Sequence, residues 1–416
     1  MVKLSRYILV LTGVLVAAVS IPSLYWLVIA KVPPSPVIFY STVLDDFIIV
    51  NSSRMEERST RIDSKGNTYD QADYERVMPL MFFRQLIADG RMPDSINGVP
   101  MDPALLNRYN YSYRFNPRSF DAPTPSLYPL LESQSGRVNL EMPDDYFRMK
   151  RGIEFIVARD NKVNVEKSRL FTDALTEKGF RFPASIIAGI PTTRKSKDEG
   201  YFITDRDGKL FHLKMVKGAP FVEAIYTPEG FEIIQIECVD MRTSEYYAYI
   251  YTRSHGVFVL MDEVYDLQRL PVEGFNPYEN TLRVNGDMFN KCISWIGENW
   301  IKAVAVDDMY NVVKEYEESW PAVHDLTEGK IFAALFPFHI ELKSSNSSFI
   351  RLYLKLSHSY IWIITNVVLA LVYVIYLFRS RKPLVPHIID IIIVVTTGVF
   401  GLIAVSVYPN RFHKKK

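Results

Sequence analysis

The sequence predicts a membrane-anchored, mainly β (α+β) protein with three transmembrane helices and one large extracytoplasmic domain. Long apolar runs occupy both ends of the 416 residues, and a polar middle separates them. That middle repeats a strand–turn–strand pattern. Aromatic residues reach 13% of the chain, mostly Tyr and Phe, and these residue types favour pleated, half-buried sheet surface.

The first apolar run, Tyr7 to Ala30, predicts an N-terminal transmembrane anchor over residues 1–30. At about 1.5 Å per residue the run exceeds a hydrocarbon core of about 30 Å. It is also longer than the apolar region of a cleaved signal peptide, about 7–15 residues, which favours a retained anchor. Residues 31–36, Lys-Val-Pro-Pro-Ser-Pro, predict a stiff, extended spacer.

Two further runs, Ser359 to Phe378 and Ile388 to Tyr408, predict a C-terminal two-helix transmembrane hairpin over residues 359–408. Asn366 lies within the first of them. An unpaired amide is costly in hydrocarbon, so we expect it to bond to another helix. Thr397 and Gly401 form a small-xxx-small pair that lets helices approach closely. We therefore expect Asn366, Thr397 and Gly401 to form a transmembrane interaction surface.

Asp390 is the acidic residue of the third run. Pro386 suits a helix start, so Asp390 falls in the first turn, near headgroups and the positive end of the helix dipole. This position favours an interfacial residue over a functional acid within the membrane.

The orientation follows from basic residues beside the spans. Lys3, Arg6, Arg379, Arg381 and Lys382 lie on the side opposite the domain, which favours a cytoplasmic location for them and an inner-membrane protein with a periplasmic domain. Three spans, however, leave the basic C-terminal tail on the domain's side. The first helix, basic before it and followed by Asp45-Asp46, decides for an extracytoplasmic domain.

The domain divides by pattern into an α+β region, 37–200, and a β-hairpin repeat region, 201–350. Helical spacing predicts a helix from Asp70 to Asp89 and a second from Val165 to Lys178. Strand–turn–strand units start near 201, 247 and 300, with Gly208 and Gly256 at or beside two of the turns. A spacing of roughly 45–50 residues suits propeller-like blades or stacked β-hairpins, and a twisted β-sandwich stays open.

The motifs favour structural roles over chemistry. Asp205-Arg-Asp-Gly-Lys209 lacks the further acids of a calcium loop and predicts a hairpin turn. The histidines are spread too widely for metal spacing, although His212 and His255 occupy similar places in successive hairpins. Cys238 and Cys292 predict two buried free thiols or a single cross-link. Neither a nucleophile elbow nor a phosphate-binding or dinucleotide loop occurs, so we expect no catalytic, cofactor or metal site.

Several stretches resemble an uncharacterised family of membrane-anchored proteins of Bacteroidota that is classed as a domain of unknown function. They are residues 92–98 (MPDSING), 126–133 (SLYPLLES), 135–145 (SGRVNLEMPDD), and 180–183 (FRFP) with 191–195 (PTTRK). The resemblance extends over nearly the whole chain. Because such proteins are often encoded beside ABC-transporter components, it implies an accessory role at the inner membrane and brings no catalytic residues.

The sequence thus predicts a non-enzymatic, membrane-tethered accessory or scaffold protein, associated through the resemblance with an ABC transporter. Its expected partners are the bilayer and other membrane-protein subunits, such as a transporter permease. With 48 basic and 47 acidic residues, the net charge of +1 gives no reason to expect nucleic-acid binding. The alternatives are an extracytoplasmic ligand-binding or sensing domain, which a concave aromatic site would favour, and an enzyme of unrecognised type, which would need convergent titratable residues.

Overall fold

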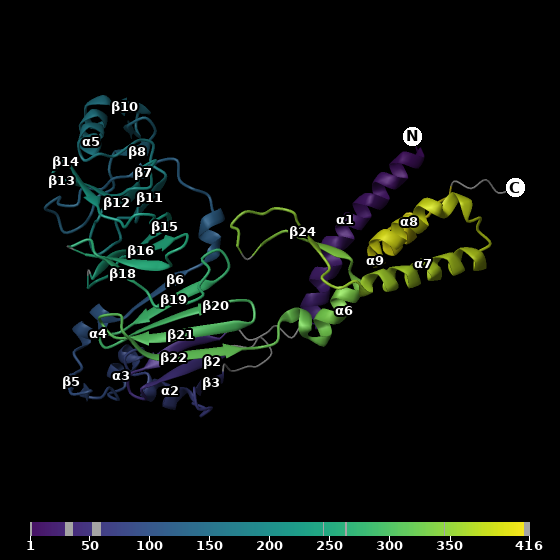
Figure 1. Cartoon of the computed structure of the whole chain (residues 1–416), viewed down its shortest axis with the longest axis horizontal. Helices are drawn as coiled ribbons and strands as arrows, with labels where there is room; N and C mark the ends of the chain where they lie inside the picture. Colours follow the sequence, from purple (N-terminus) through teal and green to yellow (C-terminus); the bar gives the residue numbers. More distant parts are fainter. Residues whose placement is uncertain are drawn as a thin grey trace.

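A computed structural model describes residues 2–29, 36–51, 60–243, 245–262, 264–344 and 346–411. A β-rich domain lies at one end of the molecule and a group of apolar helices at the other (Figure 1). The predicted spacer at 31–36 lies outside the described residues except for Pro36.

The domain is built from five antiparallel sheets of three to five strands. Four of them are formed by consecutive stretches of chain, and each takes its name here from its strands. They are β1–β3 (Val37–Ser41, Asp46–Asn51, Thr60–Asp63), β7–β10 (Tyr128–Pro129, Asp145–Met149, Ile153–Val157, Lys162–Asn164), β11–β14 (Ile186–Gly189, Tyr201–Thr204, Leu210–Val216, Ala219–Ile225) and β15–β18 (Ile233–Cys238, Tyr246–Thr252, Val257–Met261, Leu267–Arg269).

The fifth sheet has the order β22-β21-β20-β19-β6. Four of its strands follow one another in the chain and give the sheet the name β19–β22: β19 (Thr281–Gly286), β20 (Lys291–Ile296), β21 (Trp300–Val306) and β22 (Val312–Ser319). The edge strand β6, Tyr111–Phe115, comes from much earlier in the chain and pairs with β19. Two small sheets, β4–β5 (Ser95–Ile96, Val99–Pro100) and β23–β24 (Phe338–Glu341, Tyr353–Leu356), complete the set among the described residues.

The five sheets stack face to face, and separate apolar cores fill the spaces between neighbours. Phe147 and Phe211 belong to the core between β7–β10 and β11–β14, and Phe202 and Ile250 to the core between β11–β14 and β15–β18. The next two cores join β15–β18 to β19–β22 and β19–β22 to β1–β3. The stack is therefore open, with β7–β10 at one end and β1–β3 at the other (Figure 1). The mainly β (α+β) class is confirmed, and its antiparallel strands stack as sheets of three to five strands. The propeller-like alternative is wrong because the described sheets do not close into a ring.

The predicted turn glycines have the expected backbone. Gly208 has φ +83° and Gly256 has φ +94°, in the left-handed region that a side chain disfavours. Asp205 accepts hydrogen bonds from the backbone N–H groups of Asp207 and Lys209, both at 2.9 Å, which explains the acidic motif as a hairpin turn.

The helices of the domain are short. The predicted helix over 70–89 is two helices, α2 (Gln71–Val77) and α3 (Phe83–Ala88), because Pro79 has no N–H group and cannot continue the first. The predicted helix near 165 is α5, Val165–Glu177, and it packs on the end of the stack. Helix α4 (Pro103–Tyr109) and the 3₁₀ turn η1 (Pro117–Asp121) flank β6, whereas η2 (Val323–Asp325) and α6 (Thr327–Leu335) lead from β22 toward the apolar helices.

Two helices, α1 (Val2–Ile29) and α7 (Ile361–Arg379), are long and apolar enough to cross a membrane. The predicted third transmembrane helix is wrong. After the turn η3 (Val385–His387), it is broken at Gly398 into α8 (Ile388–Thr397) and α9 (Val399–Val407). These have 10 and 9 residues, or about 15 and 14 Å, and each is too short to cross about 30 Å.

Helices α8 and α9 fold back on each other. The Asn410 side chain, beyond the end of α9, donates a hydrogen bond of 2.8 Å to the backbone carbonyl of Pro386, before the start of α8. Arg6, near the start of α1, donates one of 2.9 Å to the carbonyl of Tyr408. The start of α8 and the end of α9 therefore lie on the same side as the start of α1 (Figure 1). The pair forms a helical hairpin, called the re-entrant hairpin here because both of its ends lie on one side.

Candidate functional site

A cavity of the domain lies where one sheet covers only part of another. Sheet β1–β3 packs on β20, β21 and β22, with Ile38 and Phe47 in the core they share. It leaves the same face of β19 and β6 uncovered. Residues 77–85, which comprise the α2–α3 link with the adjoining helix ends and are called the α2–α3 connection here, lie over this part of the sheet and bound a cavity of about 780 Å³ that is open to solvent.

The wall of the cavity formed by β1 and the α2–α3 connection is mostly apolar, and the floor formed by β6 and β19 is polar. The volume of the cavity falls within the roughly 300–1,000 Å³ typical of small-molecule sites. The apolar wall comes from β1 and from the α2–α3 connection. Its residues include Val37, Phe39, Val77, Met78, Leu80, Met81 and Phe82.

The floor is formed by alternate residues of β6 and β19. Leu282 and Val284 point into the core against β15–β18, so Arg283 and Asn285 point to the opposite face, into the cavity. The same alternation in β6 turns Ser112 and Arg114 toward the cavity.

Arg114 and Arg283 stand directly opposite each other in the antiparallel ladder. Directly opposed side chains have Cβ atoms about 4.5–5.5 Å apart, and like charges there are destabilising. Among the described residues neither arginine forms an ion pair with a carboxylate. Burial and the neighbouring charge of Arg114 both lower the pKa of Arg283 from its ordinary value, and an arginine in such a site still keeps its charge. The floor thus carries two adjacent positive charges without an acidic partner.

The acid of the cavity, Asp287, belongs to the other end of β19. It lies four residues beyond Arg283, roughly 14 Å along an extended strand. Its carboxylate accepts hydrogen bonds from the backbone N–H groups of Phe289 (2.8 Å) and Asn290 (2.9 Å). Burial nevertheless raises the pKa of Asp287. Asp287 is therefore engaged by its own turn and does not neutralise the arginines.

The predicted site residues Asn366, Thr397 and Gly401 are brought together at the tip of the re-entrant hairpin. Asn366 is fully buried and donates a hydrogen bond of 3.0 Å to the carbonyl of Val395 in α8, so it does bond to another helix. Gly398 has φ +59°, and a Cβ there would lie 2.1 Å from the Asn366 Oδ1 atom. A Cβ at Gly401 would lie 2.3 Å from the Thr397 hydroxyl oxygen. These residues pack together where the chain reverses direction between α8 and α9. That they also contact another protein stays a prediction.

Asp390 lies in the first turn of α8, as predicted, but it is fully buried rather than interfacial. Its carboxylate forms an ion pair of 2.8 Å with Arg6 and lies 3.1 Å from His387 Nδ1. The pair joins α1 to the re-entrant hairpin. Sequence reasoning missed it because Arg6 was assigned to solvent on the cytoplasmic side.

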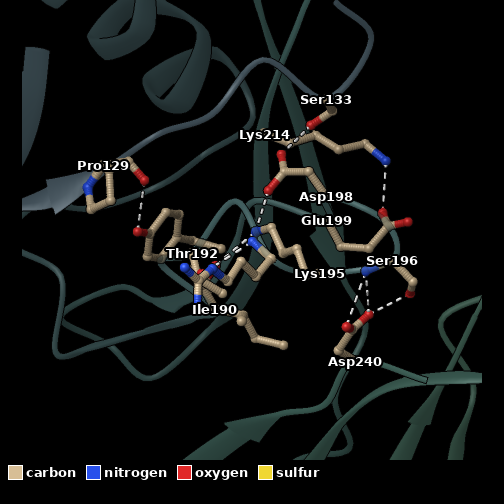
Figure 2. A network of polar contacts seen from close by, with 12 residues as sticks. Pro129, Ser133, Ile190, Thr192, Lys195, Ser196, Asp198, Glu199, Lys214 and Asp240 are labelled. Atoms are coloured by element: carbon tan, nitrogen blue, oxygen red, sulfur yellow. Dashed lines mark hydrogen bonds and ion pairs between the residues drawn. The ribbon is translucent and has the colours of Figure 1, made fainter. Parts of the chain in front are cut away.

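A second buried polar network surrounds Lys195, within the resembling stretch 191–195 (Figure 2). Its ammonium group lies 2.5 Å from Asp198 and donates a hydrogen bond to the carbonyl of Ile190, and Ser133 donates one to Asp198. The side chains of Lys195 and Asp198 are 3% and 1% exposed. The adjacent cavity of about 40 Å³ has room for about three water molecules. The network therefore links loops of neighbouring sheets and has no room for a ligand.

His212 and His255 do not converge. His212 is fully buried, and its ring nitrogens lie 2.8 Å from the Tyr265 hydroxyl and 2.6 Å from the Glu199 carbonyl. It is a core histidine with both nitrogens satisfied. Cys238 and Cys292 are both free, so the cross-link alternative is wrong.

Chemically, the cavity is suited to binding. Burial raises the pKa of its thiol, Cys292, which faces the carbonyl of Ile38 at 3.7 Å. In the described part of the chain, no group of three His, Cys, Asp or Glu side chains is placed to hold a metal ion.

A family model described as a domain of unknown function, DUF4857, matches residues 37–306. Neither a curated protein nor a solved structure matches the chain. The matched region contains every residue that lines the large cavity, Val37 to Cys292, but none of the apolar helices, so it is shorter than the near-complete resemblance expected from the sequence. Because the match exceeds half of the 416 residues, the chain belongs to the DUF4857 family.

Proposed function

We propose that this protein is a non-enzymatic, membrane-tethered ligand-binding protein, and that the cavity between β1–β3, the α2–α3 connection and the β6–β19 edge is its binding site. The observation that carries the proposal is the combination of a cavity of about 780 Å³ with an apolar wall and a polar floor. A few placed polar groups within an apolar lining are typical of small-molecule sites. The cavity therefore supports a ligand-binding function better than it supports a scaffold function without a ligand.

The orientation proposed from the sequence gains support from the re-entrant hairpin. With three full spans, the tail after Tyr408 would lie on the domain's side. With α8 and α9 folded back, Arg411 lies instead on the side of Arg6, Arg379 and Arg381. Basic residues then gather on one side, which favours that side as cytoplasmic. We propose an inner-membrane protein with its domain in the periplasm.

An accessory role beside an ABC transporter, and an origin in Bacteroidota, rest on the sequence resemblance alone. A ligand-binding domain held at the membrane by α1 and α7 is compatible with such a role. Co-purification of membrane-protein subunits with the full chain in mild detergent tests it.

The binding function is tested by photolabelling. The full chain in phosphatidylcholine nanodiscs is exposed to a decanol analogue that carries a diazirine, and labelled peptides are mapped. We expect labels in residues 77–85, in addition to the apolar helices. Ser112→Trp fills the floor of the cavity and should abolish the labels in residues 77–85 while sparing those in α1 and α7. Ser254→Trp, in an exposed turn, is the matched control. Equal labelling of residues 77–85 in all three proteins, or in none, would contradict the proposal.

A further inference from the structure

We infer that the ligand of this cavity is an amphiphile whose anionic head, a phosphate or a carboxylate, binds between Arg114 and Arg283 and whose apolar body lies against the α2–α3 connection. The inference rests on the proposed binding function and adds the chemical class of the ligand.

The arginine pair is the first support. Directly opposed like charges destabilise a sheet, and an anion between the two arginines relieves their repulsion. Asp287 is the one carboxylate among the described residues that line the cavity. It accepts hydrogen bonds from the backbone N–H groups of Phe289 and Asn290 and lies about a strand's length from Arg283. A ligand anion supplies the missing charge. Two guanidinium groups side by side present several N–H donors in the planar arrangement that suits carboxylate and phosphate oxygens.

The surroundings of the pair define the rest of the ligand. Aliphatic, aromatic and thioether side chains form much of the wall opposite the floor, among them Phe39, Met78 and Phe82. Such a wall stabilises an apolar body by removing it from water. A cavity of about 780 Å³ lies within the range of about 300–1,000 Å³ that small-molecule sites occupy. This size fits one acyl chain or a compact ring system with a head group.

The basic character continues outside the cavity. A smaller hollow of about 230 Å³ adjoins it, and the two share Arg84, Asn110 and Tyr111. Arg108 and Arg242 also line this hollow, together with one acid, Asp240, whose carboxylate accepts hydrogen bonds from the backbone N–H of Ser196. Arg84 donates a hydrogen bond of 2.7 Å to the Asn107 side chain, which fixes its position at the junction. An approaching anion therefore meets positive charge before it reaches Arg283.

The test compares two diazirine probes of equal chain length, decyl phosphate and decanol, on the full chain in phosphatidylcholine nanodiscs. We expect the phosphate probe to reach half-saturation of labelling in residues 77–85 at a concentration at least tenfold lower than the alcohol. Arg283→Gln should raise that concentration 10- to 100-fold for the phosphate probe, as expected for lost hydrogen bonds to a charged group, and leave the alcohol unchanged. Arg283→Lys, which keeps the charge and loses the planar fork, should fall between.

Arg159→Gln removes an exposed arginine of the domain and is the matched control. Because the opposed arginines are unfavourable without an anion, Arg283→Gln should unfold at the same temperature as the wild type or higher, which separates loss of binding from loss of folding. Equal half-saturation for the two probes, or an equal loss in Arg159→Gln, would overturn the anionic head while leaving a ligand-binding cavity. Failure of both probes to label residues 77–85 would overturn the binding function itself.

The source of the anion is resolved by competition. Weaker labelling by decyl phosphate in nanodiscs that contain phosphatidic acid identifies a membrane lipid as the occupant. Unchanged labelling there identifies a soluble amphiphile, and both outcomes support the inference. If millimolar inorganic phosphate displaces the probe, and the half-saturation concentration does not depend on the length of the probe's alkyl chain, the apolar half of the inference is contradicted.

Discussion

Replacing Asp390 with Ala should detach helix α1 from the re-entrant hairpin. Asp390 is fully buried, the Arg6 side chain is 7% exposed, and 2.8 Å separates their charged atoms. Without the carboxylate, a buried guanidinium loses its partner, and breaking a buried pair in this way costs about 3–5 kcal/mol. Replacing both residues with Leu removes both charges together and should cost much less, since apolar substitutes for a buried pair are often neutral.

The assay is SDS titration of the full chain in mild detergent, followed by energy transfer between dyes at Thr12 on α1 and Ser406 on α9. Both positions are exposed and lie on helices that pack together. The separation of α1 from α9 is thereby measured without interference from unfolding of the sheets. If Asp390→Ala separates at the same SDS fraction as the wild type, or the double Leu variant is as unstable as the single Ala variant, the pair does not hold these helices together.

Three further outcomes are expected. Burial lowers the pKa of His212 to about 4, below its ordinary value near 6.5, so at acidic pH the unfolded chain binds a proton that the folded chain excludes. The free energy of unfolding should therefore fall, by at most about 3 kcal/mol, as the pH drops from 6.5 to 4. Thermal melts of His212→Gln should show a smaller loss over the same pH range. Gly208→Val should lower stability by about 1–2 kcal/mol or more, and Gly256→Val likewise, because both glycines have positive φ; unchanged unfolding temperatures would contradict this. An impermeant thiol reagent on intact cells, with both native cysteines removed, should label a cysteine at Ser64 but spare one at Arg411; the reverse pattern would refute the orientation.

Periodicity was sufficient to predict the repeating part of the fold. The hairpins from 201 to 319 form because β-rich runs alternate with Gly-containing turns, and these signals are local. The break in the predicted helix at 70–89 has a signal in the sequence, because Pro79 interrupts the helical pattern. The apolar spacing on either side of Pro79 nevertheless predicts one helix, and this prediction was wrong.

The open stack of sheets and the cavity could not be predicted from the sequence, because both depend on contacts between segments that are far apart in the chain. Strand β6 joins a sheet whose other strands follow about 170 residues later, and only this pairing sets Arg114 opposite Arg283. The break at Gly398 depends similarly on Asn366 lying beside it. A glycine within an apolar run is compatible with a continuous span, so length alone predicted a third transmembrane helix.

The most direct test of the proposed site is an experimental structure of the full chain with decyl phosphate bound. We expect the phosphate within about 2.7–3.2 Å of nitrogen atoms of both Arg114 and Arg283, and the chain against Met78 and Phe82. A cavity filled by the protein's own side chains, or a phosphate bound away from both arginines, would contradict the proposed site.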